Sequence, residues 1–264
     1  MNRSTMIVPG LFVGVAALMA SFGAAFQPGG ASTTPPASPP RQAEPNTASS
    51  TIPAGRTDKA WIDKHEAILA DARKGGWAVA FVGDSITEGW KSAGKTVWES
   101  SIAPHKALNC GIGGDRTQHV LYRLDHGVLS ALKQTEPASP VKTVVLMIGT
   151  NNTAKPANTG EEIAAGVQAA VQRLRTALPE TKIVLMAILP RGERPNPQRE
   201  VIADANRRIE KLADGKLVVW LDIGPQFLDK DGAIPKELMP DYLHLSEAGY
   251  RKWADALAPM LTDK

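Results

Sequence analysis

The stretch Trp77-Ala-Val-Ala-Phe-Val-Gly-Asp-Ser85 joins an apolar run to a polar turn. A short run of this kind predicts a strand that is buried on both faces of a sheet. Four further runs have the same character: Lys106–Asn109, Val141–Ile148, Lys182–Leu189 and Leu217–Asp222. The sequence therefore predicts five buried strands.

Helical periodicity fills the segments between these runs. Apolar residues recur every three or four positions from Ile163 to Leu178, with Thr159 and Glu162 at capping-box spacing ahead of them. The segments Asn196–Ala213 and Ser246–Leu261 have a similar pattern. Strands that alternate with helices imply right-handed crossovers, and hence a parallel sheet covered by helices on both faces. The predicted fold class is α/β.

The composition limits the classes of protein to which the chain can belong. Its 264 residues include 30 basic and 27 acidic side chains, for a formal charge of +3. This length fits one folded core with an appendage, and the absence of a long basic run predicts no nucleic-acid partner. Cys110 is the only cysteine, which excludes an intramolecular disulfide and a Cys-x-x-Cys metal or redox site.

Residues 1–25 have the composition of a secretory signal. A positively charged start precedes the apolar run Ile7–Phe26, and small residues near its end place cleavage after Ala25. The same run is long enough to cross a bilayer uncleaved. We expect a protein exported to the periplasm or the extracellular space, with a membrane tether formed by residues 7–26 as the alternative.

Residues 26–56 are rich in Pro, Ser and Thr. Such a composition cannot bury enough apolar surface to offset the entropy of ordering the chain. We therefore predict a disordered linker over residues 26–56 and a folded domain over residues 57–264.

Polar residues follow three of the predicted strands, at the sheet edge where ligands bind in parallel α/β folds. Ser85 follows the first strand, where its alternative role is a helix N-cap. Gly111, Gly113 and Gly114 follow the second strand; such glycines let backbone N–H groups approach a ligand, or simply form a tight turn. Asn151 follows the third strand and could direct an amide donor into the same cleft.

Asp241-Tyr-Leu-His244 stands just ahead of the last predicted helix, with Ser246 as the expected N-cap. A spacing of three lets one short loop hold a carboxylate against the imidazole Nδ1. The alternative is that both side chains only bond the backbone of the loop. A serine hydroxyl is a poor nucleophile until an oriented, neutral histidine accepts its proton. Together with Ser85, these residues predict a site for nucleophilic catalysis.

These blocks resemble those of the SGNH, or GDSL-type, hydrolase family. Its four blocks, in order, are a serine in Gly-Asp-Ser, a glycine, an asparagine in Gly-x-Asn, and Asp-x-x-His, and this chain has all four in that order. Three longer stretches are similar to the catalytic subunits of the intracellular platelet-activating factor acetylhydrolases: Asn109–Leu124, Leu189–Pro197 and Asp241–Ser246. The resemblance covers about residues 57–262 and implies the three-layer α/β/α, flavodoxin-like SGNH fold.

The resemblance also implies a role for each residue of the four blocks. Ser85 corresponds to the nucleophile, His244 to the general base and then acid, and Asp241 to the carboxylate that orients it. The oxyanion hole would consist of the backbone N–H groups of Ser85 and Gly114 and the side-chain amide of Asn151. No metal and no cofactor are implied. The subunits of the resembled group pair, so the resemblance allows a homodimer, although no apolar stripe in the sequence exceeds what the sheet needs to cover itself.

Three further residues are similar in place to the floor of a small acyl pocket: Ile86, Thr150 and Leu243. Ordinary packing is the alternative role for them. With the pocket, we expect a serine esterase that hydrolyses short-chain esters, above all acetyl esters, through an acyl-enzyme intermediate. Its substrate would be an O-acetylated glycan or an acetylated phospholipid.

Two other functions are compatible with parts of the sequence. One is an exported binding protein of the same fold that has lost turnover, although the sequence shows no damage to the four blocks. The other is nucleotide binding, because Gly89-Trp-Lys-Ser-Ala-Gly-Lys-Thr96 matches the P-loop pattern. A P-loop glycine comes directly off a buried strand, whereas Gly89 stands four residues beyond Ser85. We therefore favour the esterase.

Overall fold

The structure is a computed structural model that describes residues 50–133 and 141–261. The predicted signal and the predicted linker as far as residue 49 lie outside the described residues, as do residues 134–140 and 262–264. In the described part of the chain, no helix combines the length and the apolar character needed to span a membrane.

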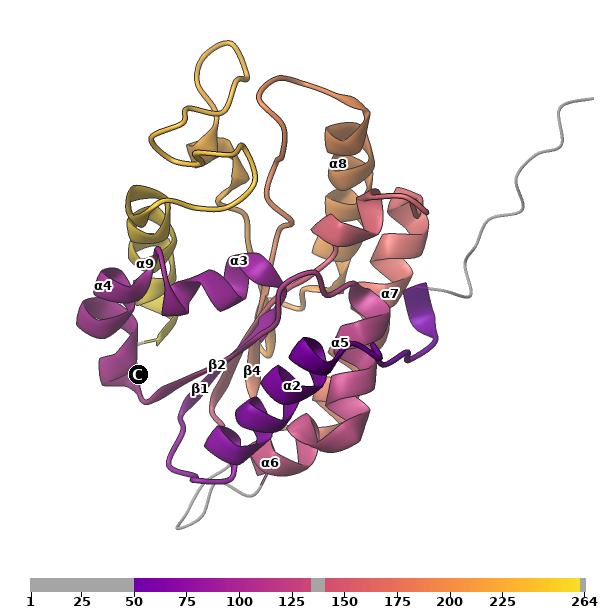
Figure 1. Cartoon of the computed structure of the whole chain (residues 1–264), viewed down its shortest axis with the longest axis vertical. Helices are drawn as coiled ribbons and strands as arrows, with labels where there is room; N and C mark the ends of the chain where they lie inside the picture. Colours follow the sequence, from indigo (N-terminus) through magenta and orange to yellow (C-terminus); the bar gives the residue numbers. More distant parts are fainter. Residues whose placement is uncertain (1–49, 134–140, 262–264) are drawn as a thin grey trace, which may run out of the picture. The chain divides into compact units, whose positions relative to one another are not determined.

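Five parallel strands form one sheet in the order β2-β1-β3-β4-β5 (Figure 1). The strands are β1 (Val79–Gly83), β2 (Ala107–Gly111), β3 (Thr143–Met147), β4 (Lys182–Met186) and β5 (Val218–Leu221). All five predicted strands are therefore confirmed. The order is that of flavodoxin-like sheets, whose direction of winding reverses between β1 and β3. The carboxyl ends of β1 and β3 consequently flank the position at which such folds bind ligands.

The second strand is longer than the sequence predicts. It continues past Asn109 because Cys110 pairs in register with Val82 and Gly111 pairs with Gly83. Cys110 is thus a buried strand residue. The loop that carries Gly113 and Gly114, called the glycine loop below, begins after Gly111. Burial raises the pKa of its thiol to about 11, so the thiol stays protonated and acts as a small packing group.

Helices cover both faces of the sheet and complete the predicted three-layer sandwich (Figure 1). One layer contains α2 (Lys59–Ala72), α5 (Thr117–Arg123), α6 (Leu129–Lys133), α7 (Gly160–Ala177) and α8 (Pro197–Ile209). The other contains α3 (Ser85–Glu88), α4 (Lys95–Val97) and α9 (Glu247–Leu261). Short 3₁₀ and π turns join them: η1 (Gly89–Lys91), η2 (Trp98–Ile102), η3 (Ala103–His105), η4 (Leu124–Val128), η5 (Thr150–Thr153), η6 (Glu210–Leu212) and η7 (Gly224–Phe227).

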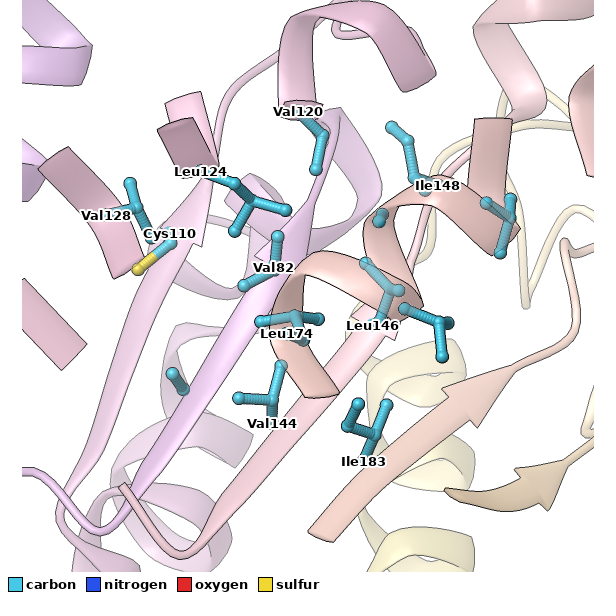
Figure 2. Packing of buried hydrophobic residues seen from close by; sticks show 14 of the residues in the cluster. Val82, Cys110, Val120, Leu124, Val128, Val144, Leu146, Ile148, Leu174 and Ile183 are labelled. Atoms are coloured by element: carbon cyan, nitrogen blue, oxygen red, sulfur yellow. The ribbon is translucent and has the colours of Figure 1, made fainter. Parts of the chain in front are cut away.

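Two apolar cores lie on opposite faces of the sheet, because successive strand side chains point to opposite sides. Val82 and Cys110 point into the core beneath α5 and α7, where they meet Val120, Leu124 and Leu174 (Figure 2). The neighbouring strand residues, such as Phe81 and Met147, enter the other core together with residues of α3, α4 and α9. Apolar side chains therefore cover both faces of the sheet, as near-continuous apolar runs predict.

The helix caps follow the sequence signals. Thr159 Oγ1 accepts the Glu162 N–H at 3.2 Å, and a Glu162 carboxylate oxygen accepts the Thr159 N–H at 2.7 Å, which completes the predicted capping box of α7. Ser246 Oγ accepts the Gly249 N–H at 3.2 Å at the start of α9. This cap fixes where the chain leaves the Asp241–His244 loop and enters the last helix.

The chain ahead of α2 lies against the domain from Ser50 onward, within the range predicted as linker. Thr117 Oγ1 donates to the Ser50 carbonyl at 2.8 Å, and the Ala54 N–H donates to the Gln118 carbonyl at 3.1 Å. Residues 50–56 therefore run along the first turn of α5, next to the glycine loop that follows β2.

Candidate active site

Ser85 is the first residue of α3, directly after β1 and the residue Asp84. Asp84, not Ser85, caps this helix, because its Oδ1 accepts the Ile86 N–H at 3.0 Å. A Cβ added to Gly83 would lie 2.2 Å from Thr87 Oγ1 and 2.4 Å from the Met147 carbonyl, so only glycine fits where the strand turns into the helix. The Ser85 hydroxyl is left available for another partner.

That partner is His244, which is 159 residues away in the sequence. His244 Nε2 lies 2.9 Å from Ser85 Oγ, and His244 Nδ1 lies 2.7 Å from Asp241 Oδ2. Since a carboxylate accepts, the Nδ1 proton faces Asp241, and Nε2 of the neutral ring accepts the serine proton. The three residues that the sequence predicts as nucleophile, base and orienting acid therefore lie in one hydrogen-bonded line, in the arrangement that activates a serine hydroxyl.

The Asp241 carboxylate is held in its ionised form. Partial burial works against this, but hydrogen bonds from the His244 side chain and from the N–H groups of His244 and Leu243 lower its pKa below the ordinary value. The backbone bonds to Oδ1 measure 2.7 Å from His244 and 3.1 Å from Leu243. One carboxylate oxygen thus fixes the loop, and the other orients the imidazole.

The loop that carries Asp241 is hydrogen-bonded to a second loop, which follows β4. Tyr242 has a φ of +60°, a left-handed conformation that is unusual for a residue other than glycine. The Tyr242 carbonyl accepts a hydrogen bond from the Gly192 N–H at 2.8 Å. Arg199 in turn donates to the carbonyls of Arg191, Gly192 and Glu193. The stretch Leu189–Pro197 singled out by the sequence therefore supports the Asp241–His244 loop from the side.

The last helix is tied to the helix that begins with Ser85. The Tyr250 hydroxyl donates to the Ile86 carbonyl at 2.7 Å, and both side chains are fully buried. Since His244 lies just ahead of α9 and Ser85 begins α3, this bond fixes the spacing of the two elements that carry the nucleophile and its base.

The predicted oxyanion donors gather beside Ser85. A Cβ added to Gly113 would lie 3.6 Å from Ser85 Cβ, so the glycine loop passes at contact distance. Gly114 has a φ of +80°, which only glycine adopts without strain. Asn151, in the 3₁₀ turn after β3, donates through Nδ2 to the Asp115 carbonyl at 2.9 Å. The loops after β1, β2 and β3, which carry the three predicted donor groups, are thus in contact with one another.

A buried arginine that the sequence reasoning missed holds these strand ends together. Arg123 is 1% exposed and donates to Asp115 Oδ2 at 2.7 Å, to the Cys110 carbonyl at 2.7 Å and to the Gly83 carbonyl at 3.0 Å. Asp115 also accepts the Trp61 indole N–H at 2.7 Å. Arg123 and Asp115 both stand within the stretch Asn109–Leu124, so the resemblance contained the signal, although no local pattern assigns them a task.

Asp84 is an unusual carboxyl group beside Ser85. Burial raises its pKa to about 7, the Asp115 charge adds to the rise, and His244 and Arg191 oppose it. Its main hydrogen bond is the helix cap to the Ile86 N–H. The group therefore keeps its proton to a much higher pH than an ordinary aspartate does.

The three residues predicted to form the acyl pocket are placed differently from one another. Ile86 and Thr150 are each 2% exposed, whereas Leu243 is half-buried and packs on the core beneath α9. Arg191 donates through Nη1 to the Thr150 carbonyl at 3.0 Å and to its Oγ1 at 3.3 Å. Arg191, a second arginine that the sequence reasoning did not assign, thus secures the residue next to Asn151.

The segment that matches the P-loop pattern has a different structure. It begins after α3 rather than at the end of β1. The Gly94 N–H bonds the Gly89 carbonyl at 3.0 Å, and the Lys95 N–H bonds the Ser92 carbonyl at 3.0 Å. A Cβ on Gly89 would lie 2.0 Å from the Tyr250 hydroxyl, which shows how closely α9 covers the segment. Backbone donors that would face a phosphate are therefore used inside the turn.

Comparison with known proteins agrees with this site. Residues 81–252 match the GDSL-like Lipase/Acylhydrolase family. The chain is 40% identical over 199 residues to the platelet-activating factor acetylhydrolase IB subunit alpha2 of Rattus norvegicus, covering 74% of this chain and 80% of the rat protein. It is 37% identical over 209 residues to the corresponding subunit alpha1 of Bos taurus, covering 77% and 83%.

The fold is also found among solved structures. A protein described as a putative platelet activating factor from Streptococcus pneumonia superposes with a TM-score of 0.60 at 27% identity, covering 76% of this chain and 94% of that one. The match over most of the domain and the identity to the curated subunits together place this protein: the chain belongs to the GDSL-like lipase/acylhydrolase family and is a carboxylic ester hydrolase.

Proposed function

We propose that the enzyme hydrolyses short-chain esters, above all acetyl esters, through a covalent acyl-enzyme on Ser85. The observation that carries this proposal is the hydrogen-bonded line from Asp241 through His244 to Ser85, with distances of 2.7 and 2.9 Å. The same geometry favours turnover over a silent binding protein, because a protein that only bound esters would have no need of an oriented base.

The reaction follows from the donors and acceptors in place. Ser85 Oγ attacks the ester carbonyl carbon while His244 Nε2 takes the serine proton. The resulting oxyanion accepts hydrogen bonds from the N–H groups of Ser85 and Gly114 and from the Asn151 amide. Collapse of the tetrahedral intermediate breaks the bond to the alcohol oxygen, which leaves with the proton from His244. Water, deprotonated by His244, then releases the acid from Ser85.

The proposal of a small acyl group rests on the residues next to the catalytic ones, which offer little exposed apolar surface. Ile86 and Thr150 are each 2% exposed. Leu243, next to His244 in the sequence, is half-buried and would supply an apolar contact. The name of the curated relatives, acetylhydrolase, supports the same conclusion.

Two substrates fit an acetyl esterase with this sequence. The relatives' name favours an acetylated phospholipid such as platelet-activating factor. The predicted export favours an O-acetylated glycan outside the cytoplasm. We also propose that residues 1–25 direct this export and that the enzyme forms a homodimer. Cell fractionation with N-terminal sequencing, and light scattering on the purified protein, test these two points.

The decisive experiment compares initial rates on an acetylated phospholipid, on acetylated oligosaccharides and on nitrophenyl esters of increasing acyl length, with Ser85→Ala as the blank. We expect turnover of acetyl esters, loss of activity with octanoyl and longer esters, and a mass increase of one acetyl group on Ser85 in quenched samples. An enzyme that prefers long acyl chains, or a Ser85→Ala variant that retains turnover, contradicts the proposal.

A further inference from the structure

Arg56 lies against the glycine loop although it belongs to the segment predicted as linker. Its Nη1 donates to the Gly113 carbonyl at 2.8 Å. A Cβ added to Gly114 would lie 3.0 Å from the same nitrogen, so the guanidinium group covers Gly114 from one side. In Figure 1 the indigo segment that contains Arg56 runs past α5 into α2.

The hydrogen bond from Arg56 fixes the direction of the Gly114 N–H. The Gly113 carbonyl and the Gly114 N–H belong to one planar trans peptide, in which the two groups point in opposite directions. Because the carbonyl faces Arg56, the N–H faces away from Arg56. Within the described ranges no protein acceptor takes this N–H, so it remains free for a ligand.

A second group holds the same loop from the other side. Glu88, at the end of the helix that begins with Ser85, accepts the Gly113 N–H at 2.7 Å. Lys64 from α2 pairs with the other oxygen of Glu88 at 2.6 Å. The peptide before Gly113 is thus tied to α3, and the peptide after it is tied to Arg56.

Arg56 is itself held in a defined orientation. Its Nε donates to Asp58 Oδ2 at 2.9 Å, and Asp58 Oδ1 accepts the Trp61 N–H as the cap of α2. Arg56 Nη1 also lies 3.9 Å from the buried carboxylate of Asp115. The guanidinium group therefore has a carboxylate on each of two sides and a carbonyl in front, which leaves few other orientations open to it.

We propose that Arg56 is a positioning residue for the oxyanion hole: it orients the Gly114 N–H towards the developing oxyanion. This inference rests on the proposed acyl-enzyme chemistry at Ser85. The benefit of an oxyanion donor depends on its being oriented before the reaction begins. A loop of glycines has many accessible conformations. The hydrogen bond from Arg56, which lies outside the loop, restricts them.

The test is Arg56→Ala in the full chain, assayed on an acetyl ester. We expect kcat to fall by about tenfold or more with KM changed by less than about twofold, since the lost orientation matters in the transition state. Arg173→Ala is the matched control. Arg173 is 29% exposed against 31% for Arg56, pairs with Asp125 at 2.9 Å and donates to a carbonyl, but lies on α7. Its removal leaves kcat unchanged.

Arg56→Lys provides a second test of the positioning role if the alanine variant does not fold. Lysine keeps the positive charge but carries its donors on a single nitrogen, so it lacks the planar fork that reaches both Asp58 and Gly113. We expect an intermediate kcat at unchanged KM and unchanged melting temperature. Wild-type kcat in a folded Arg56 variant overturns the positioning role, while the proposed function survives if Ser85→Ala is inactive. A Ser85→Ala variant with full turnover overturns both.

Discussion

Asn151 donates one of its two amide hydrogens to the Asp115 carbonyl at 2.9 Å, which leaves the other hydrogen available to a ligand. The loop after β3 is thereby joined to the loop after β2, and two of the predicted oxyanion donors are set relative to each other. The side chain is fixed by the protein before any substrate arrives. Four predictions follow from this and the neighbouring contacts.

Replacing Asn151 with alanine removes a donor to the oxyanion and the tie between the two loops. We expect kcat to fall by about a hundred- to a thousandfold, with a small change in KM. Steady-state kinetics on an acetyl ester measure both parameters, and circular dichroism checks that the variant is folded. Wild-type turnover in a folded Asn151→Ala enzyme would exclude this side chain from the oxyanion hole.

Asp241→Asn keeps the shape of the side chain but removes the negative charge that faces His244 Nδ1. The amide can offer a hydrogen to Nδ1, which places the ring proton on Nε2 and leaves no acceptor for the Ser85 proton. We expect kcat to fall by about four orders of magnitude. The side chain is 56% exposed, so the melting temperature should change little. A loss of stability without loss of kcat at permissive temperature contradicts the orienting role.

Asp84 makes the stability depend on pH in a direction opposite to that of most carboxylates. Its pKa rises from 3.8 to about 7 on folding, so the folded state binds the proton more tightly than the unfolded state. The stabilisation is fully present below pH 3.8 and is lost as the pH rises through about 7. Asp84→Asn keeps the cap and cannot ionise. Between these pH values its free energy of unfolding should therefore rise relative to that of the wild type, by roughly 4 kcal/mol at the upper end.

Denaturant unfolding at a series of pH values measures this difference. The comparison of Asp84→Asn with the wild type cancels the contributions of the other carboxylates, whose ionisation both proteins share. A difference that stays constant from acid to neutral pH contradicts the raised pKa.

Arg123→Met should destabilise the fold by about 3 to 5 kcal/mol, because it leaves the buried Asp115 carboxylate without its partner. It also removes the donor to the carbonyls of Gly83 and Cys110. Urea unfolding measures the loss. Adding Asp115→Asn to the same chain should recover part of it, since a neutral amide is less costly to bury than an unpaired charge. A single variant as stable as the wild type contradicts the role of Arg123.

The strands and the three residues of the Ser85, Asp241 and His244 line were predictable because each is encoded locally. A buried parallel strand must be apolar at nearly every position, and that pattern is visible in any window of the sequence. The extension of β2 to Gly111 could not be predicted, because glycine has no preference for strands and Gly111 is held in the strand by pairing with Gly83. The alternative role of Ser85 as the helix N-cap belongs to its neighbour Asp84; both residue types are good N-caps, so the sequence alone did not separate them.

The arginines around the site could not be predicted from local patterns. Arg123 bonds Gly83, which is 40 positions away, and Arg56 bonds Gly113, which is 57 positions away. Arg191 likewise reaches Thr150 across 41 positions. Each acceptor is a backbone carbonyl, which every residue possesses, so the sequence carries no mark of the partner. The predicted linker shows the same limit. Its composition is that of an unfolded segment, and only the fold shows that Arg56, within this range, donates to the Gly113 carbonyl.

The bond between the Tyr250 hydroxyl and the Ile86 carbonyl has a consequence for the order of events during synthesis. The nucleophile emerges with the first strand, but the loop that carries its base is held by the Gly192 N–H and by the final helix, both of which come later in the chain. We therefore expect intermediates that lack a docked α9 to be inactive, however complete their sheet. Recovery of ester hydrolysis during refolding accordingly reports the docking of α9, and so does the fluorescence of Trp90 in η1, whose ring centroid lies 4.5 Å from that of Tyr250 and 5.1 Å from that of Trp253.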